Sequence, residues 1–291
     1  MEIKILRMFV AVVREGGFSQ AAKAVLSTQS TVSKAVKRLE DELDLLLIDR
    51  GAPGATLTDA GEVVFRRALA ILAERDDLLL ELGELRGLKR GVLHLGLPPI
   101  GSDTLFAPSF VAFRHRYPGI EIQLVERGCQ DLEHLLRAGE IDLAGLLLPF
   151  GDEFAWQDVC SEPIVGVVSA SHPLTARESA PIAAFAGSPF LLFETGFSLN
   201  QIVLAACRRS GFTPNVTARS TQVEFLFDLI AAGLGVGFLP RMMVEARPHD
   251  GIRAIALDDP DMCWHMALAW RRNGYLSEAA KAWLALVRRP A

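Results

Sequence analysis

The apolar residues of the first 43 positions recur at a spacing that predicts three short amphipathic helices. In each segment they return every three or four residues, which places them on one face of an α-helix. Between the second and third segments, the break LSTQS offers Ser27 and Thr28 as side chains that cap a helix start. The apolar positions are Ile3, Leu6, Val10 and Val13, then Ala21, Ala22, Val25 and Leu26, then Val32, Ala35, Val36, Leu39 and Leu43. The pattern predicts a helix-turn-helix.

The polar face of the third helix is a basic stripe, formed by Lys34, Lys37 and Arg38 beside small hydroxyl side chains. Lys and Arg contact phosphates, whereas short polar side chains at the front of a helix reach base edges in the major groove. A basic helix face is more often simply solvated, so the stripe alone is weak evidence. The hypothesis is that this face binds DNA. It assigns base reading to Gln29, Ser30, Thr31 and Ser33, and phosphate contacts to Lys34, Lys37 and Arg38.

The segment LLLIDRGAPGATLTDAG predicts a short hairpin beside the helix-turn-helix. Two extended runs flank a turn rich in glycine and proline, around Gly51, Pro53 and Gly54. Such a wing makes the unit a winged helix, and Arg50 at its edge is a further candidate for a phosphate contact.

A long helix without proline is predicted from Asp59 to Leu88. Its apolar residues follow a heptad spacing interrupted once, at Arg75, and this spacing is typical of a coiled-coil seam. The alternative is a helix packed on its own domain, but the preceding segment is too short to cover about thirty residues. We therefore expect a dimerisation helix, followed by a hinge in RGLKRG at 86–91. The seam residues are Val64, Ala68, Ile71, Arg75, Leu78, Leu82 and Leu85.

Beyond the hinge, apolar strands alternate with helical segments, which predicts two α/β lobes with a largely parallel sheet. The strands expected are VLHLGL, IEIQLVE, IDLAGLLL, IVGVVSA, FLLFE and VGFLP. In such folds a ligand binds at the carboxyl ends of the strands, between the lobes and near helix N-termini.

Three segments with hydroxyl side chains at predicted helix starts are expected to line that cleft. PPIGSD contributes Ser102, TGFSLN contributes Thr195 and Ser198, and RSTQVE contributes Thr221. Hydroxyls and free N–H groups at converging helix starts favour a small anion, most simply a carboxylate, although each hydroxyl can equally be an ordinary helix cap. Cys129 and Gln130, after the second strand, are further pocket candidates. Phe150, Phe197 and Phe238 fit either the core or the pocket wall.

Composition excludes several other classes of protein. The net charge is -5, no segment is long and apolar enough to cross a bilayer, and the first residues lack a secretory signal, so a cytoplasmic location is expected. The four cysteines and six histidines are dispersed, with no spacing typical of a metal site or a disulfide framework. We expect reduced thiols, no metal and no cofactor.

An enzyme and a free solute-binding protein are the alternatives from other classes. GLGVG at 233–237 follows a predicted helix and precedes a strand, the reverse of the order in a dinucleotide-binding motif, and no G-x-S-x-G elbow is present. Neither alternative explains residues 1–88. The sequence predicts a regulator with no catalytic residues.

The whole chain resembles the LysR-type transcriptional regulators. The amino-terminal pattern of that family is matched by Phe9, Gly17, Phe18, Ala21, Ala22, Leu26, Gln29, Ser33, Leu39, Glu40, Leu43, Arg50, Leu57, Thr58, Ala60 and Gly61. RYPGIEIQLVERG, LRAGEIDLAG, SASHPL and IAAGLGVGFLP resemble its effector domain. The chain departs from the family at Ser30, commonly proline, at Asp44, commonly glycine, and at Ile48, commonly phenylalanine.

The resemblance implies an α/β protein with three parts. These are a winged helix-turn-helix over 1–58, a linker helix and hinge over 59–90, and an effector domain over 91–291 similar to periplasmic type 2 solute-binding proteins. The first lobe of that domain is expected over about 91–162 and 267–291, and the second over about 163–266. The implied partners are double-stranded DNA, a small-molecule effector and further copies of the chain, as a dimer through the linker helix or a tetramer, with no membrane contact.

Overall fold

The computed structural model describes residues 1–49, 55–85 and 91–287. They form two compact units, the first made mainly of residues 1–88 and the second mainly of residues 89–291, and each is described by itself. None of the described helices is long and apolar enough to span a membrane.

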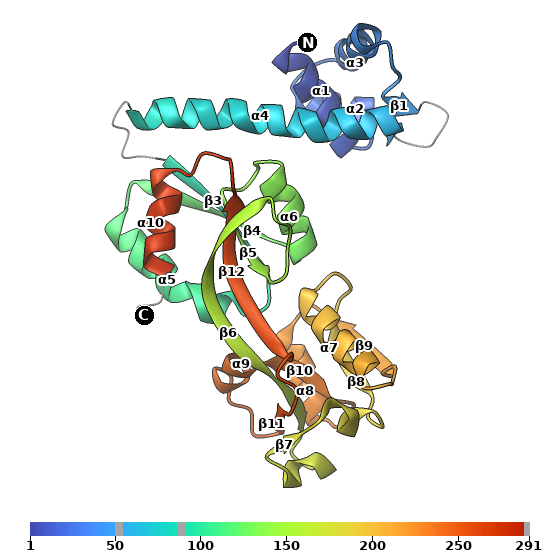
Figure 1. Ribbon diagram of the computed structural model, residues 1–291, viewed down its shortest axis with the longest axis vertical. Coiled ribbons are helices and arrows are strands. Elements are labelled where there is room, and N and C mark those ends of the chain that lie inside the picture. Colours follow the sequence, from blue (N-terminus) through green and yellow to red (C-terminus); the bar gives the residue numbers. More distant parts are fainter. Residues whose placement is uncertain (50–54, 86–90, 288–291) are drawn as a thin grey trace. The chain divides into compact units, whose positions relative to one another are not determined.

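The first unit is the predicted winged helix-turn-helix followed by a long helix (Figure 1). Helices α1 (Ile3–Arg14), α2 (Phe18–Ala24) and α3 (Gln29–Leu43) precede two short antiparallel strands, β1 (Ile48–Asp49) and β2 (Thr56–Leu57), and then α4 (Asp59–Leu85). Arg50 and the turn at 51–54 lie outside the described residues, as do residues 86–90 of the predicted hinge and of the predicted end of the long helix.

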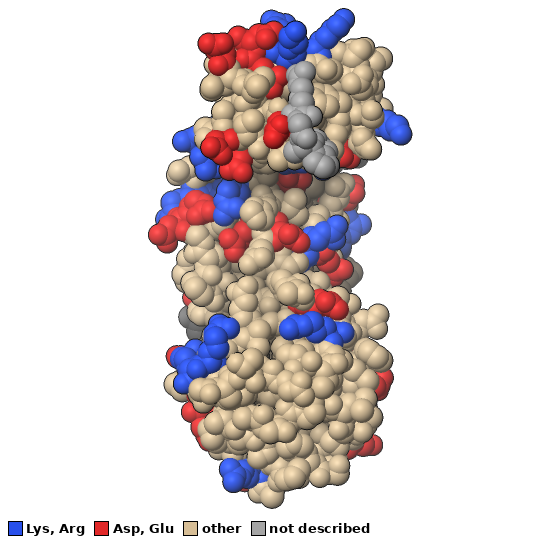
Figure 2. Space-filling model, turned by 90° about the vertical axis from the view of Figure 1, so that its right-hand side faces the viewer, with Lys and Arg blue, Asp and Glu red and all other residues tan. Residues whose placement is uncertain are grey.

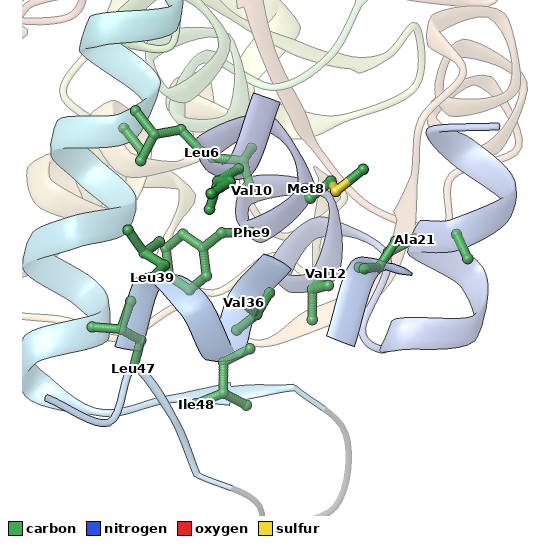
Figure 3. Packing of buried hydrophobic residues seen from close by; sticks show 14 residues of the cluster. Leu6, Met8, Phe9, Val10, Val12, Ala21, Val36, Leu39, Leu47 and Ile48 are labelled. Carbon is green, nitrogen blue, oxygen red and sulfur yellow. The ribbon is translucent and has the colours of Figure 1, made fainter. Parts of the chain in front are cut away.

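The apolar faces predicted for α1 and α3 form the core of this unit. Phe9, Val36 and Leu39 are fully buried, and Figure 3 shows Phe9 and Leu39 beside Leu47 between the helices. Three of the predicted apolar positions are exposed: Ile3 and Leu43 at the ends of α1 and α3, and Leu26. Leu26 is 96% exposed, because its backbone has a φ of 51° at the end of α2, which turns the side chain outward. Val25 alone continues the buried face there.

Two polar contacts join the wing to the helices. The buried carboxylate of Glu40 accepts hydrogen bonds from the backbone N–H groups of Leu47 at 2.9 Å and Ile48 at 3.3 Å. Thr58 accepts from the N–H of Gly61 at 3.0 Å and so caps the start of α4. A Cβ at Gly61 would lie 2.0 Å from the carbonyl oxygen of Leu47, so only glycine allows this approach of α4 to the wing.

The second unit is built on an eight-stranded sheet in the order β4-β3-β5-β12-β6-β11-β7, with β10 paired to β6. Its strands are β3 (Gly91–Leu97), β4 (Ile120–Glu126), β5 (Leu143–Leu147), β6 (Phe154–Ser169), β7 (Ser179–Ala180), β10 (Gly237–Pro240), β11 (Ile252–Leu257) and β12 (Cys263–Arg271). A separate parallel pair is formed by β8 (Phe190–Phe193) and β9 (Val216–Ser220).

The sheet is mixed, so the expectation of a largely parallel sheet was wrong. β3 is parallel to β4 and β5, but β12 is antiparallel to β5 and β6, and β6 is antiparallel to β10 and β11. β5 and β6 are consecutive in the chain but are not neighbours in the sheet, because β12 lies between them and is antiparallel to both. The sequence reading also missed β11, β12 and the first half of β6.

Two lobes share the long strands β6 and β12, which run side by side through the unit (Figure 1). The first lobe holds β3, β4 and β5 with α5 (Ser102–Arg116), α6 (Cys129–Arg137) and α10 (Glu278–Val287). The second holds β7 to β11 with α7 (Ser198–Arg209), α8 (Val223–Ala231) and α9 (Arg241–Glu245). Two short 3₁₀ segments, Pro173–Ala176 and Ile182–Phe185, flank β7. The predicted lobe boundaries at 162/163 and 266/267 fall inside β6 and β12, where the chain is continuous strand.

The Glu40 contact generates a prediction about the stability of the first unit. Glu40→Ala leaves two buried N–H groups without their acceptor, so we expect the winged helix to lose about 2 to 4 kcal/mol of stability. Amide hydrogen exchange of α1 and α3 in the intact chain measures this loss. Asp41→Ala, an exposed neighbour on the same helix, is the control and should change stability by no more than about 0.5 kcal/mol. Equal effects of the two substitutions would contradict the role of Glu40.

Candidate DNA interface and effector cavity

The exposed face of α3 carries nearly all of the residues assigned to DNA. Thr28 caps the helix by accepting a hydrogen bond from the N–H of Thr31 at 3.2 Å, as the LSTQS segment predicted. Ser33 is half-buried, whereas the other assigned residues are exposed: Gln29, Ser30, Thr31, Lys34, Lys37 and Arg38. The first turn of α3 contains no acid, so its free N–H groups and positive end are compatible with a phosphate.

One of the three cations of this face has an acidic neighbour in the same unit. The guanidinium of Arg38 lies 2.8 Å from the carboxylate of Glu2, and both side chains are exposed. Figure 2 shows Lys and Arg side chains projecting beside acidic ones at the upper end of the view. A phosphate contact by Arg38 therefore has to compete with the ion pair to Glu2.

The long helix α4 divides into a part packed on the winged helix and a part that is not. Ala68 is buried in the core of the first unit, and Val64 packs against it, so the predicted seam is wrong at these two positions. Arg75, where the predicted heptad spacing is interrupted, is exposed. Farther along, Leu78 is 55% exposed and Leu82 is 44% exposed, and Leu79 is exposed beside them. Apolar side chains thus line the second half of α4 without cover from the first unit.

In the second unit, a small cavity lies where the two lobes meet. The space between its lining residues is about 250 Å³ when the part open to solvent is counted, and the centres of water-sized molecules can occupy only about 10 Å³ of it. The first lobe contributes residues that follow β3 and β4 and the last residue of β5, the second contributes the start of α7, and Trp264 of the shared strand β12 closes one side. The lining residues are Pro98, Ile100, Gly128, Cys129, Leu147, Phe197, Ser198, Leu199 and Trp264.

The polar side chains of this cavity are a thiol and a hydroxyl at the first residues of two helices. Cys129 begins α6 and Ser198 begins α7, and the two side chains are hydrogen-bonded to each other. Burial raises the pKa of the Cys129 thiol, and the hydrogen bond with Ser198 lowers it only in part, so the thiol is protonated at neutral pH. No Lys or Arg is among the lining residues. A ligand here meets apolar walls and the positive ends of two helices.

The structure brings together two of the six residues assigned to the effector, Cys129 and Ser198. Ser102 is buried behind the cavity, and its hydroxyl donates to the carbonyl oxygen of Pro98, a lining residue. It does not cap α5, whose N-cap is Gly101. The remaining three, Gln130, Thr195 and Thr221, are exposed and are not among the lining residues.

Two of the three segments expected to line the cleft, PPIGSD and TGFSLN, do line the cavity, although their apolar residues Ile100 and Leu199 were not singled out. Trp264 was missed, because it lies in the overlooked strand β12. Phe150, Phe197 and Phe238 fitted either the core or the pocket wall, and of these Phe197 lines the cavity. Phe238 is buried against Phe185 and Phe190, and Phe150 packs on Phe154 and Trp156. A hydrophobic pattern cannot separate a core position from a cavity wall, because both are apolar and buried.

The described residues contain no group of three His, Cys, Asp or Glu side chains placed to hold a metal ion. The glycines at 233–237 follow α8 and lead into β10, of which Gly237 is the first residue, and this is the helix-to-strand order expected from the sequence.

Two family models match the chain, and together they cover nearly all of it. Residues 3–62 match "Bacterial regulatory helix-turn-helix protein, lysR family", and residues 86–290 match "LysR substrate binding domain".

Individual relatives span almost the full length of the chain. It is 32% identical to the uncharacterised HTH-type transcriptional regulator YwbI of Bacillus subtilis, over 98% of this chain and 95% of that protein. It is 29% identical to the DNA-binding transcriptional dual regulator OxyR of Escherichia coli, over 97% and 95%. Among solved structures, a full-length OxyR variant from Pseudomonas aeruginosa has a TM-score of 0.75 at 26% identity, with 99% of this chain and 95% of that chain covered. The chain therefore belongs to the LysR family, as a DNA-binding transcriptional regulator with an effector-binding domain.

Proposed function

We propose that α3 reads DNA through its exposed face, that the second half of α4 joins two copies of the chain, and that the cavity between the lobes senses a small monocarboxylic acid. The observation that supports the first part is the exposure of Lys34, Lys37 and Arg38 on one side of a helix whose other side is core. Gln29, Ser30, Thr31 and Ser33, at the front of the same helix, are the proposed base readers. Arg50 stays a proposed phosphate contact.

The proposed ligand class follows from the chemistry of the cavity. Its walls are apolar, and no lining residue is cationic, so a ligand with several charges would be poorly compensated there. A single carboxylate can accept hydrogen bonds from Ser198 and from the free N–H groups at the starts of α6 and α7. Its hydrocarbon part would pack on Trp264 and Ile100. We keep four residues outside the lining as proposed ligand contacts, because a larger ligand or another lobe angle would bring them into reach. They are Ser102, Gln130, Thr195 and Thr221.

Redox sensing is the second candidate, because relatives include a protein named hydrogen peroxide-inducible genes activator in Escherichia coli. A peroxide-reactive cysteine needs to be an accessible thiolate. Burial raises the pKa of Cys129, and it raises that of Cys207 to about 11. Cys160 is also buried, and Cys263 is half-buried. These features favour a bound ligand over thiol oxidation as the signal.

The proposed switch couples the cavity to DNA through the lobe angle. A ligand that prefers one closure of the lobes shifts the equilibrium between closures by its difference in affinity for them. In a dimer that reads paired half-sites, such a shift changes the spacing of the two α3 helices, and so changes DNA bending or footprint length more than affinity. A coupling free energy of about 1 to 3 kcal/mol would be sufficient.

The DNA interface is tested by salt-dependent binding. Lys34→Ala, Lys37→Ala and Arg38→Ala should each weaken binding and reduce the slope of log K against log salt by about one unit, because one phosphate contact is lost. Glu2→Gln should strengthen binding several-fold by freeing Arg38. Lys281→Ala, which removes a cation from α10, is the matched control. An unchanged slope in a Lys34→Ala/Lys37→Ala double variant would exclude these contacts.

The dimer seam is tested by sedimentation. Leu78→Asp and Leu82→Asp place a charge in the proposed interface, so the dimer dissociation constant should rise by about a hundredfold or more. Arg66→Asp, an exposed position on another side of α4, should leave the oligomer intact. If the leucine variants sediment like the wild type, the second half of α4 is not the interface.

The cavity is tested by a thermal-shift screen of small monocarboxylates, dicarboxylates and neutral analogues. At about ten times its dissociation constant, a matching acid should raise the Tm by about 3 °C. Ser198→Leu fills the cavity and should abolish the shift, whereas Thr195→Ala, outside the lining, should keep it. A shift that survives Ser198→Leu and disappears in Thr195→Ala would move the site to the exposed loop. A response of footprints to hydrogen peroxide, reversed by a thiol reductant, would favour redox sensing.

A further inference from the structure

One arginine contacts elements of both lobes of the second unit. Arg247 follows α9 in the second lobe, and Nε donates to the carboxylate of Glu224 on α8 at 3.1 Å, while Nη1 lies 3.4 Å from the carbonyl oxygen of Met243. The same guanidinium reaches α5 of the first lobe. There Nη1 donates to the hydroxyl of Thr104 at 3.3 Å, and Nη2 donates to the carboxylate of Asp103. Arg247 is thus held by two groups of its own lobe and by two groups of the other.

Because Arg247 is mostly buried, the loss of its hydrogen-bond partners would be costly. Its side chain is 20% exposed, whereas the carboxylates of Asp103 and Glu224 are 59% and 73% exposed. Each carboxylate alone is well hydrated and contributes modestly, as exposed ion pairs do. The guanidinium is mostly removed from water and has five N–H groups to satisfy, so opening the lobes costs it the contacts with Asp103 and Thr104.

The loop that precedes Asp103 also forms part of the cavity wall. Pro98 and Ile100 line the cavity, and α5 begins directly afterwards at Ser102. Gly101 has a φ of 81°, and a Cβ there would lie 2.8 Å from the ring of Trp264 and 3.6 Å from the side chain of Met242 on α9. The short loop at 98–101 therefore belongs to the cavity wall and also packs on α9 of the second lobe, and the Arg247 contacts lie directly beside it.

We propose that Arg247, Asp103 and Thr104 form a latch that holds the two lobes closed on the side of α5 and α9. The latch sets the balance between closed and open lobes before any ligand is present. Its influence on effector sensitivity rests on the proposed role of the cavity, whereas its effect on lobe closure does not. Glu224 acts differently, since it orients the guanidinium from within the second lobe and bridges nothing.

The two carboxylates allow a matched comparison. Asp103→Asn and Glu224→Gln each neutralise one acid bound to the same guanidinium, but only Asp103 lies across the lobe boundary. Amide hydrogen exchange is measured on the intact chain without DNA or ligand. In Asp103→Asn and Arg247→Gln, exchange should rise about three- to fivefold in both facing segments, residues 98–105 and 241–247. In Glu224→Gln, the rise should be confined to α8 and α9.

A double variant tests whether the contacts act as one latch. Arg247→Gln already removes the Asp103 contact, so Asp103→Asn added to it should change exchange no further. The latch is overturned if Asp103→Asn leaves residues 241–247 unchanged, if Glu224→Gln opens both segments equally, or if the two substitutions are additive. Because this measurement needs neither DNA nor effector, a failed gel shift would count against the proposed function and not against the latch.

Discussion

The antiparallel ladder between β6 and β12 is the interaction on which the second unit depends. The strands pair from Cys263 opposite Pro163 to Arg271 opposite Phe154, with one irregularity between Met266 and Ala267. Both lobes are continuous with these strands, so a change in the angle between the lobes must be absorbed within the ladder, and a bulge is where a ladder bends most easily. Trp264 lies on the same ladder and closes the cavity, so a ligand in the proposed site would contact the element that connects the lobes.

Electrostatics separates the two units by function. On α3, three cations stand on an exposed face, although the chain as a whole has a net charge of -5. Long-range attraction to a polyanion therefore has to come from a local patch and not from the net charge. In the cavity no lining residue is charged, and the starts of α6 and α7 contribute a positive potential. The first arrangement suits a polyanion, and the second suits a small ligand with a large apolar fraction.

Local sequence patterns were sufficient to predict those features that depend on a single helix or strand. The faces of α1 and α3, the Thr28 cap and the order of β3, α5, β4, α6 and β5 follow from periodicity and capping chemistry, because they involve residues close in sequence. The same reasoning failed at Leu26, where a positive φ reverses the side chain, and at Val64 and Ala68, whose spacing suits either a seam or a core.

The sequence by itself determined the two-part plan, the basic face of α3 and the family resemblance, since each of these is written in short, contiguous motifs. Only the tertiary structure decided that β6 and β12 make the sheet mixed, that Cys129 meets Ser198 across a cavity, and that Arg247 reaches Asp103. These partners are 69 and 144 positions apart along the chain. Contacts over such separations depend on the order of the strands in the sheet and on how the lobes close. A hydrophobic periodicity of 2 or 3.6 residues contains no information about strand order or lobe closure.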